Sequence, residues 1–164
     1  MEDLAANDLT EVVLNQDTYQ QFANAIAAAK QNKKPITLNR PGARSNIPAA
    51  QVKAALTQFD TAYNNEDWKE VAGLGAALVE ANVGPASTLG RTALAAMAFM
   101  EIGLALPLIK RAYETDPAEQ ASYLAMAAWK FVSGEPTQAG LWIDLAELAS
   151  EQRLKYHRNL RKEV

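Results

Sequence analysis

The chain has 164 residues, of which 49 % are hydrophobic and 21 % charged, and its formal net charge is −3. This composition predicts a folded globular protein rather than a disordered one, and the acidic balance argues against bulk affinity for nucleic acid. The absence of cysteine excludes disulfides and thiolate metal sites. No apolar run reaches the roughly 18 residues of a membrane span, and the acidic start does not resemble a secretory signal, so we expect a cytoplasmic protein without a membrane span.

Residues 1–48 are predicted to form an N-terminal arm that contains one helix and a linker. The V-V-L stretch at 12–14 is a candidate short strand. A helix is expected from Asn15 or Asp17, with Asp17 as a possible cap. Its apolar face would carry Tyr19, Phe22, Ala23 and Ile26. Residues 32–48 hold three prolines and a glycine among basic residues, which indicates a loop or linker.

From residue 49 onward, turn signals cut the chain into a series of short helices. They divide residues 49–153 into six pieces of about 12 to 16 residues, separated by stretches such as Y-N-N-E-D-W and V-S-G-E-P. Each piece is apolar on more than one side, so none would be stable alone in water. Tight turns between short, partly buried helices indicate stacked helical hairpins. We therefore predict an all-α fold, with residues 49–164 as a helical repeat domain.

Small or apolar positions recur at a fixed spacing along this second part. Val71, Ala105 and Ala139 each follow a turn and are equally spaced along the chain. The same spacing relates Gly75, Ile109 and Ile143; Leu78, Ala112 and Ala146; and, on the preceding helices, Phe59, Ala93 and Ala127. The common period is 34, which is that of the tetratricopeptide repeat.

Residues 104–117, L-A-L-P-L-I-K-R-A-Y-E-T-D-P, closely resemble the second helix of a tetratricopeptide (TPR) repeat. The family's alanine, bulky apolar residue, alanine and proline are matched by Ala105, Ile109, Ala112 and Pro117. Pro107 is also at a place where the family often has proline, and we expect it in the first helical turn, where it removes no intrahelical hydrogen bond. The resemblance covers roughly 100 residues and implies about three helical hairpins with a C-terminal capping helix.

The resemblance further implies a concave groove, lined by the first helix of each hairpin, that holds a peptide or helix of another protein. Carried over position by position, its residues are Lys53, Leu56, Tyr63, Leu94, Met97, Leu124 and Phe131. The basic clamp with which part of the family binds a carboxylate is absent, and Asp60 would repel one. What remains is an apolar trough from Leu94 to Phe131.

Such a trough would be costly if nothing covered it. Three covers are considered: an amphipathic helix of a partner, a second copy of the chain, or its own residues 1–50 with the Tyr19–Phe22–Ile26 face. The alternative is that these side chains are core between hairpins. The sequence leaves these possibilities open.

No pattern in the sequence indicates catalysis or a cofactor. His157 is the sole histidine, with neither metal-ligand spacing nor a nucleophile and acid arranged around it, and paired acids at turns are explained as helix caps. We therefore expect a non-catalytic adaptor or scaffold module that binds a partner protein. The alternatives are a self-assembling subunit that dimerises through the same surface, and a helical nucleic-acid accessory protein that uses the basic stretches 30–44 and 153–162.

Overall fold

The computed structural model describes residues 12–31 and 48–150, and within these ranges it is built from α-helices without a strand. The helices are α1 (Gln16–Lys30), α2 (Ala49–Asn64), α3 (Trp68–Glu80), α4 (Ser87–Ala98), α5 (Ile102–Thr115), α6 (Gln120–Val132) and α7 (Pro136–Ala149). The predicted all-α class is confirmed, and the six predicted pieces correspond to α2 to α7. Residues 12–14 have no regular structure, so the candidate strand there was wrong. The predicted capping helix after α7 lies outside the described residues.

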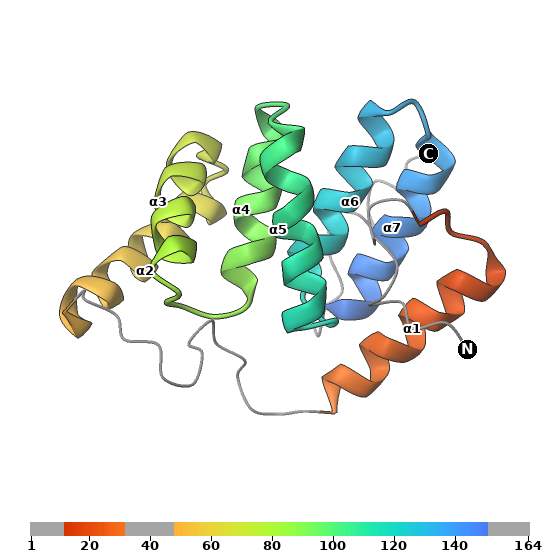
Figure 1. Cartoon of the computed structure of the whole chain (residues 1–164), viewed down its shortest axis with the longest axis horizontal. Coiled ribbons are helices and arrows are strands. Elements are labelled where there is room, and N and C mark those ends of the chain that lie inside the picture. The colour runs from red at the N-terminus through yellow and green to blue at the C-terminus, as the bar shows by residue number, and fades with distance from the viewer. Residues whose placement is uncertain (1–11, 32–47, 151–164) are drawn as a thin grey trace.

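Helices α2 to α7 stand side by side as successive pairs, and α1 lies against the far end of the row (Figure 1). Helix α4 packs against α3, α5 and α6, which places α4 and α6 at the centre of the domain. Helix α1 packs against α7 rather than against α2, which follows it in sequence. The helix of the N-terminal arm therefore belongs to the same body as the rest. No helix in the described ranges is both long enough and apolar enough to traverse a bilayer.

The turns within the pairs α2–α3, α4–α5 and α6–α7 share one backbone geometry. Each has a residue with positive φ, and these residues, Glu66 (57°), Met100 (58°) and Gly134 (83°), keep the spacing found in the sequence. The next amide in each turn donates to the carbonyl five residues earlier: Asp67 to Ala62, Glu101 to Ala96 and Glu135 to Lys130, all at 2.9 Å. This is the closure that ends helices in a Schellman motif. The repeat period of the sequence is therefore also a period of the backbone.

The sequence positions that recur with this period are also alike in burial. Every member of the four sets is buried except Ile143, which is half-buried. Gly75 shows why one set includes a glycine, since a Cβ there would lie 2.0 Å from Oγ1 of Thr92 on α4. The repeated positions thus mark the contacts between neighbouring helices.

Helix α1 is capped by Asn15 rather than by Asp17. The Asn15 side chain accepts hydrogen bonds from the amides of Asp17 (2.9 Å) and Thr18 (3.0 Å), and the Thr18 hydroxyl accepts from the Asn15 amide (2.7 Å). This reciprocal pair is a capping box. The cap predicted at Asp17 was therefore wrong: Asn15, the other residue considered for the start of the helix, is the N-cap, and the helix begins at Gln16.

The predicted apolar face of α1 is buried against the end of the helical row. Phe22 is fully buried and meets the rings of Tyr113, Tyr123 and Trp142 edge-on, with centroids 5.4, 6.5 and 5.1 Å away. The side-chain amide of Gln138 on α7 both donates to the Leu14 carbonyl and accepts from its amide, at 2.8 Å each. At the other end of α1, the Lys30 ammonium donates to the Leu148 carbonyl at 2.8 Å. Apolar burial and polar contacts at both ends thus hold α1 on α7.

Pro107 lies deeper in its helix than the sequence suggested. Because α5 begins at Ile102, Pro107 is its sixth residue, beyond the first turn where a missing amide hydrogen would have no effect. The carbonyl that loses its helical donor is that of Gly103, and both residues are on the exposed side of α5. Solvent can therefore replace the lost hydrogen bond. Pro117 follows the end of α5 as expected, and its carbonyl accepts a hydrogen bond from the Tyr123 hydroxyl.

Candidate functional site

A groove of about 520 Å³ opens between the α2–α3 turn and the α6–α7 pair. It is lined by Tyr63, Asn64, Glu66, Trp68, Leu94, Leu124, Ala127, Ala128, Phe131, Ala139 and Ile143. Its volume lies within the range of about 300 to 1,000 Å³ that natural ligand sites occupy, and its lining is mainly apolar, as such sites usually are.

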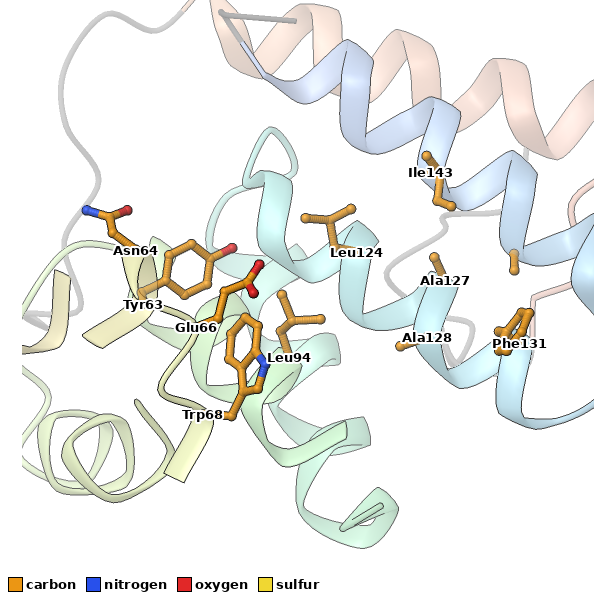
Figure 2. A pocket seen from close by; sticks show the side chains of 11 residues that line it. Tyr63, Asn64, Glu66, Trp68, Leu94, Leu124, Ala127, Ala128, Phe131 and Ile143 are labelled. Carbon is orange, nitrogen blue, oxygen red and sulfur yellow. The ribbon is translucent and has the colours of Figure 1, made fainter. Parts of the chain in front are cut away.

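The groove has a floor between two walls (Figure 2). Leu94 of α4 and Leu124 of α6 lie on the floor. Trp68 and Tyr63 stand at one wall, and Phe131 and Ile143 stand at the other. Ala127 and Ala128, on the α6 side, are small and leave space between the larger side chains. The groove could therefore accept bulky apolar side chains from a second molecule.

The wall formed by α2 and α3 is held by aromatic and ionic contacts. The rings of Tyr63 and Trp68 meet edge-on with their centroids 5.8 Å apart, and the Arg91 guanidinium lies 4.4 Å from the centre of the Tyr63 ring. Arg91 also pairs with Asp60, with 2.7 Å between Nη1 and Oδ1. Burial raises the pKa of the Tyr63 hydroxyl, and the positive charge of Arg91 opposes that shift. Tyr63 is thus a neutral side chain fixed from both sides.

The spacing of α4 and α6 depends on a glycine. A Cβ on Gly90 would lie 2.1 Å from Oε2 of Glu119 and 2.6 Å from the Ser122 amide nitrogen, so only glycine fits there. The buried Glu119 carboxylate caps α6 by accepting from that amide at 2.9 Å. Burial raises the pKa of Glu119 to about 7, although the amides of α6 oppose this shift. Leu94 follows Gly90 on α4, and Leu124 follows Ser122 on α6, each within about one helical turn. The contact between Gly90 and α6 therefore sets the positions of both leucines on the groove floor.

Exposed apolar side chains occur at and next to the turns of α4–α5 and α6–α7. We call this set the turn edge: Phe99 (49 % exposed), Met100 (57 %), Leu104 (61 %), Phe131 (67 %) and Val132 (42 %). In the described ranges, the other large apolar residues with comparable exposure are Val13 and Leu148. Phe131 belongs both to the turn edge and to the groove wall. The groove and the α6–α7 part of the turn edge therefore share the Phe131 side chain.

Four of the seven residues predicted for the groove line it: Tyr63, Leu94, Leu124 and Phe131. The other three do not. Met97 is buried in the main core, and Leu56 packs between α2 and α3, where it would contact a Cβ added to Gly84. Lys53 is exposed on α2 away from the lining.

The sequence prediction missed the parts of the groove that come from second helices and from a turn. Trp68 and Ile143 lie on α3 and α7, whereas the TPR resemblance takes groove residues only from first helices. Glu66 lines the groove from the α2–α3 turn. Trp68 could have been found from the sequence, because it lies two residues after Glu66, a turn position that recurs with the repeat.

Helix α1 does not line the groove, so its Tyr19–Phe22–Ile26 face is not the cover that was considered from the sequence. Its apolar face lies on α7 instead, as Phe22 shows.

Within residues 12–31 and 48–150, no three His, Asp or Glu side chains are grouped as a metal ion would require. Comparison of the chain with protein-family models, curated proteins and solved structures finds no significant match.

Proposed function

We propose that this protein is a cytoplasmic, non-catalytic interaction module, an adaptor or scaffold, whose groove binds an apolar helix or peptide of another protein. The observation that carries the proposal is the exposure of Phe131, at 67 %, on the wall of an apolar groove that the described part of the chain leaves open. Apolar surfaces of this kind in folded proteins mark interaction sites. Amphipathic helices commonly bind such grooves through a row of apolar side chains.

The regular architecture supports this proposal. The turns and the core positions recur with one common period, as they do in TPR-like arrays of helical pairs. Arrays of this type generally bind other proteins on an extended surface composed of successive repeats. The groove extends over residues from α2, α3, α4, α6 and α7, and so uses such a surface.

Affinity capture from the cells that make the protein tests the proposal, with tagged wild type and Phe131→Asp compared side by side. The matched control is Val13→Asp, because Val13 is also exposed, at 59 %, but lies before α1 and outside the groove. We expect a protein that is recovered with wild type and Val13→Asp but lost with Phe131→Asp, while all three have the same helical circular dichroism.

Three results would contradict the proposal. Equal recovery of every partner by all three proteins would show that the groove is not used. Loss of helicity in Phe131→Asp would show that the groove is core. If only the protein itself is recovered, and light scattering gives a dimer that Phe131→Asp dissociates, the surface serves self-assembly instead.

A further inference from the structure

The exposed acids around the groove and the turn edge follow the repeat. Asp67, Glu101 and Glu135 occupy equivalent places, one repeat apart, at the start of α3, α5 and α7. Glu66 adds a fourth exposed carboxylate on the groove wall itself. An apolar surface is therefore bordered by carboxylates at every turn of the described helical pairs.

Helix capping does not account for all of these acids. The Asp67 carboxylate accepts from the Glu70 amide at 3.4 Å, but the side chains of Glu101 and Glu135 make no capping hydrogen bond. Glu135 is 3.8 Å from the ammonium of Lys130, which is itself buried.

Basic residues are few in this region and in the described chain as a whole. Near the groove and the turns they are Lys69 on α3, the buried Lys130, and Arg91, which lies against Tyr63 and is paired with Asp60. The described residues together hold 13 acidic and seven basic side chains, a net charge of −6. The exposed carboxylates at the turns and the negative net charge would favour cationic segments over anionic ones.

We propose that the segment bound in the groove is an amphipathic helix of another protein with basic residues flanking its apolar face. Its apolar side chains would fill the space above Leu94, Leu124 and Ala128, and its basic residues would face Glu66 and the acids of the turns. A helix is preferred to an added strand because the described part of the chain has no sheet edge with which a strand could pair. This inference rests on the proposed function and adds to it the chemistry of the partner.

Two synthetic peptides of about 18 residues, or five helical turns, test the charge preference. Both have the same leucines on one face, and the other face is lysine in one peptide and glutamate in the other. Fluorescence anisotropy with the full chain measures binding. We expect the lysine peptide to bind at least about tenfold more tightly, a difference of about 1.4 kcal/mol, and its affinity to fall with added salt.

Matched variants separate the groove from the overall charge. Phe131→Ser should lower the affinity for the lysine peptide about tenfold or more, whereas Val13→Ser should leave that affinity unchanged. The double change Glu101→Lys and Glu135→Lys should reduce or reverse the preference. The control with the same charge, Glu80→Lys and Glu114→Lys, should keep it, because these exposed residues lie near the opposite ends of α3 and α5.

Several outcomes would overturn this inference. If the control pair removes the preference equally, net charge alone explains it. If both peptides bind equally and Phe131→Ser weakens both, the groove is a docking site and the proposed function stands, but the partner chemistry is wrong. Binding of neither peptide also rejects the basic helix, and the capture experiment then decides the proposed function separately. Phe131-dependent binding of a peptide of residues 151–164, in place of the lysine peptide, would make the chain's own basic end the occupant.

Discussion

The α6–α7 pair has two apolar faces, and the chain covers one of them. On the covered face, Phe22 of α1 is fully buried against Tyr123 and Trp142. On the other face, Phe131 is 67 % exposed beside the groove. Fully burying such a side chain stabilises a fold by about 1.5 to 3 kcal/mol. Phe22 gains this stabilisation in full, whereas the mostly exposed Phe131 gains only a small part of it. The open face is therefore the better candidate for a function, since its largest side chain, Phe131, is mostly exposed.

The covered face can be broken by removing the ring of Phe22. We expect Phe22→Ala to lower the free energy of unfolding by about 3 to 5 kcal/mol, because the cavity would lie among three aromatic rings that cannot all close on it. Urea denaturation followed by circular dichroism measures this loss. Phe99→Ala, at a half-exposed ring, is the control and should change stability by less than about 1 kcal/mol. A similar loss in both variants would contradict the comparison.

The stability of the fold should depend on pH through Glu119, which lies beneath the groove floor between α4 and α6. Burial raises the pKa of this carboxyl from its ordinary value of 4.5 to about 7, so the folded state binds its proton more tightly than the unfolded state. Its contribution to stability is therefore greatest below pH 4.5 and is lost as the pH rises to about 7.

Glu119→Gln isolates this contribution, because glutamine keeps an oxygen for the Ser122 amide but has no titrating group. We expect the stability of wild type relative to the variant to fall between pH 4.5 and 7, by at most about 3 kcal/mol. Urea denaturation at several pH values checks this. A difference that is flat across the range, or that rises with pH, would show that the carboxylate is well stabilised in the fold.

A pair of glycine substitutions tests whether Gly90 sets the spacing of α4 and α6. Gly90→Ala places a Cβ against Glu119 and the α6 backbone, and should cost about 1 to 3 kcal/mol. Gly103→Ala in α5 meets open space, and should instead stabilise by up to about 1 kcal/mol through helix propensity. Thermal unfolding of both variants separates the two effects. Equal shifts in Tm would mean that residue 90 does not set the spacing of the groove floor.

Much of the fold could be predicted from the sequence because it depends on local signals. Turn residues and the repeat period identified α2 to α7 and the buried positions Val71, Ala105 and Ala139. The apolar face of α1 was also recognisable, because its spacing is that of one side of a helix. The surface that this face packs against could not be predicted, since α1 contacts α7, which is far away in the sequence.

The groove was predicted less well, because it depends on distances between helices. Tyr63 and Leu124 line it as expected, but Met97 is buried although it occupies the position on α4 that corresponds to Phe131 on α6. Trp68 and Ile143 were missed because they reach the groove from second helices. Repeat position alone does not determine which of two equivalent side chains is covered by a neighbouring helix.

The face carrying Phe131 is open, and it should contribute little to the stability of the fold. Urea unfolding of Phe131→Ala beside wild type tests this most directly, with Phe22→Ala as the reference for a buried ring. We expect Phe131→Ala to unfold within about 0.5 kcal/mol of wild type with an unchanged dependence on urea concentration. A loss of about 3 to 5 kcal/mol, equal to that of Phe22→Ala, would show that Phe131 is a core residue and that the groove is closed.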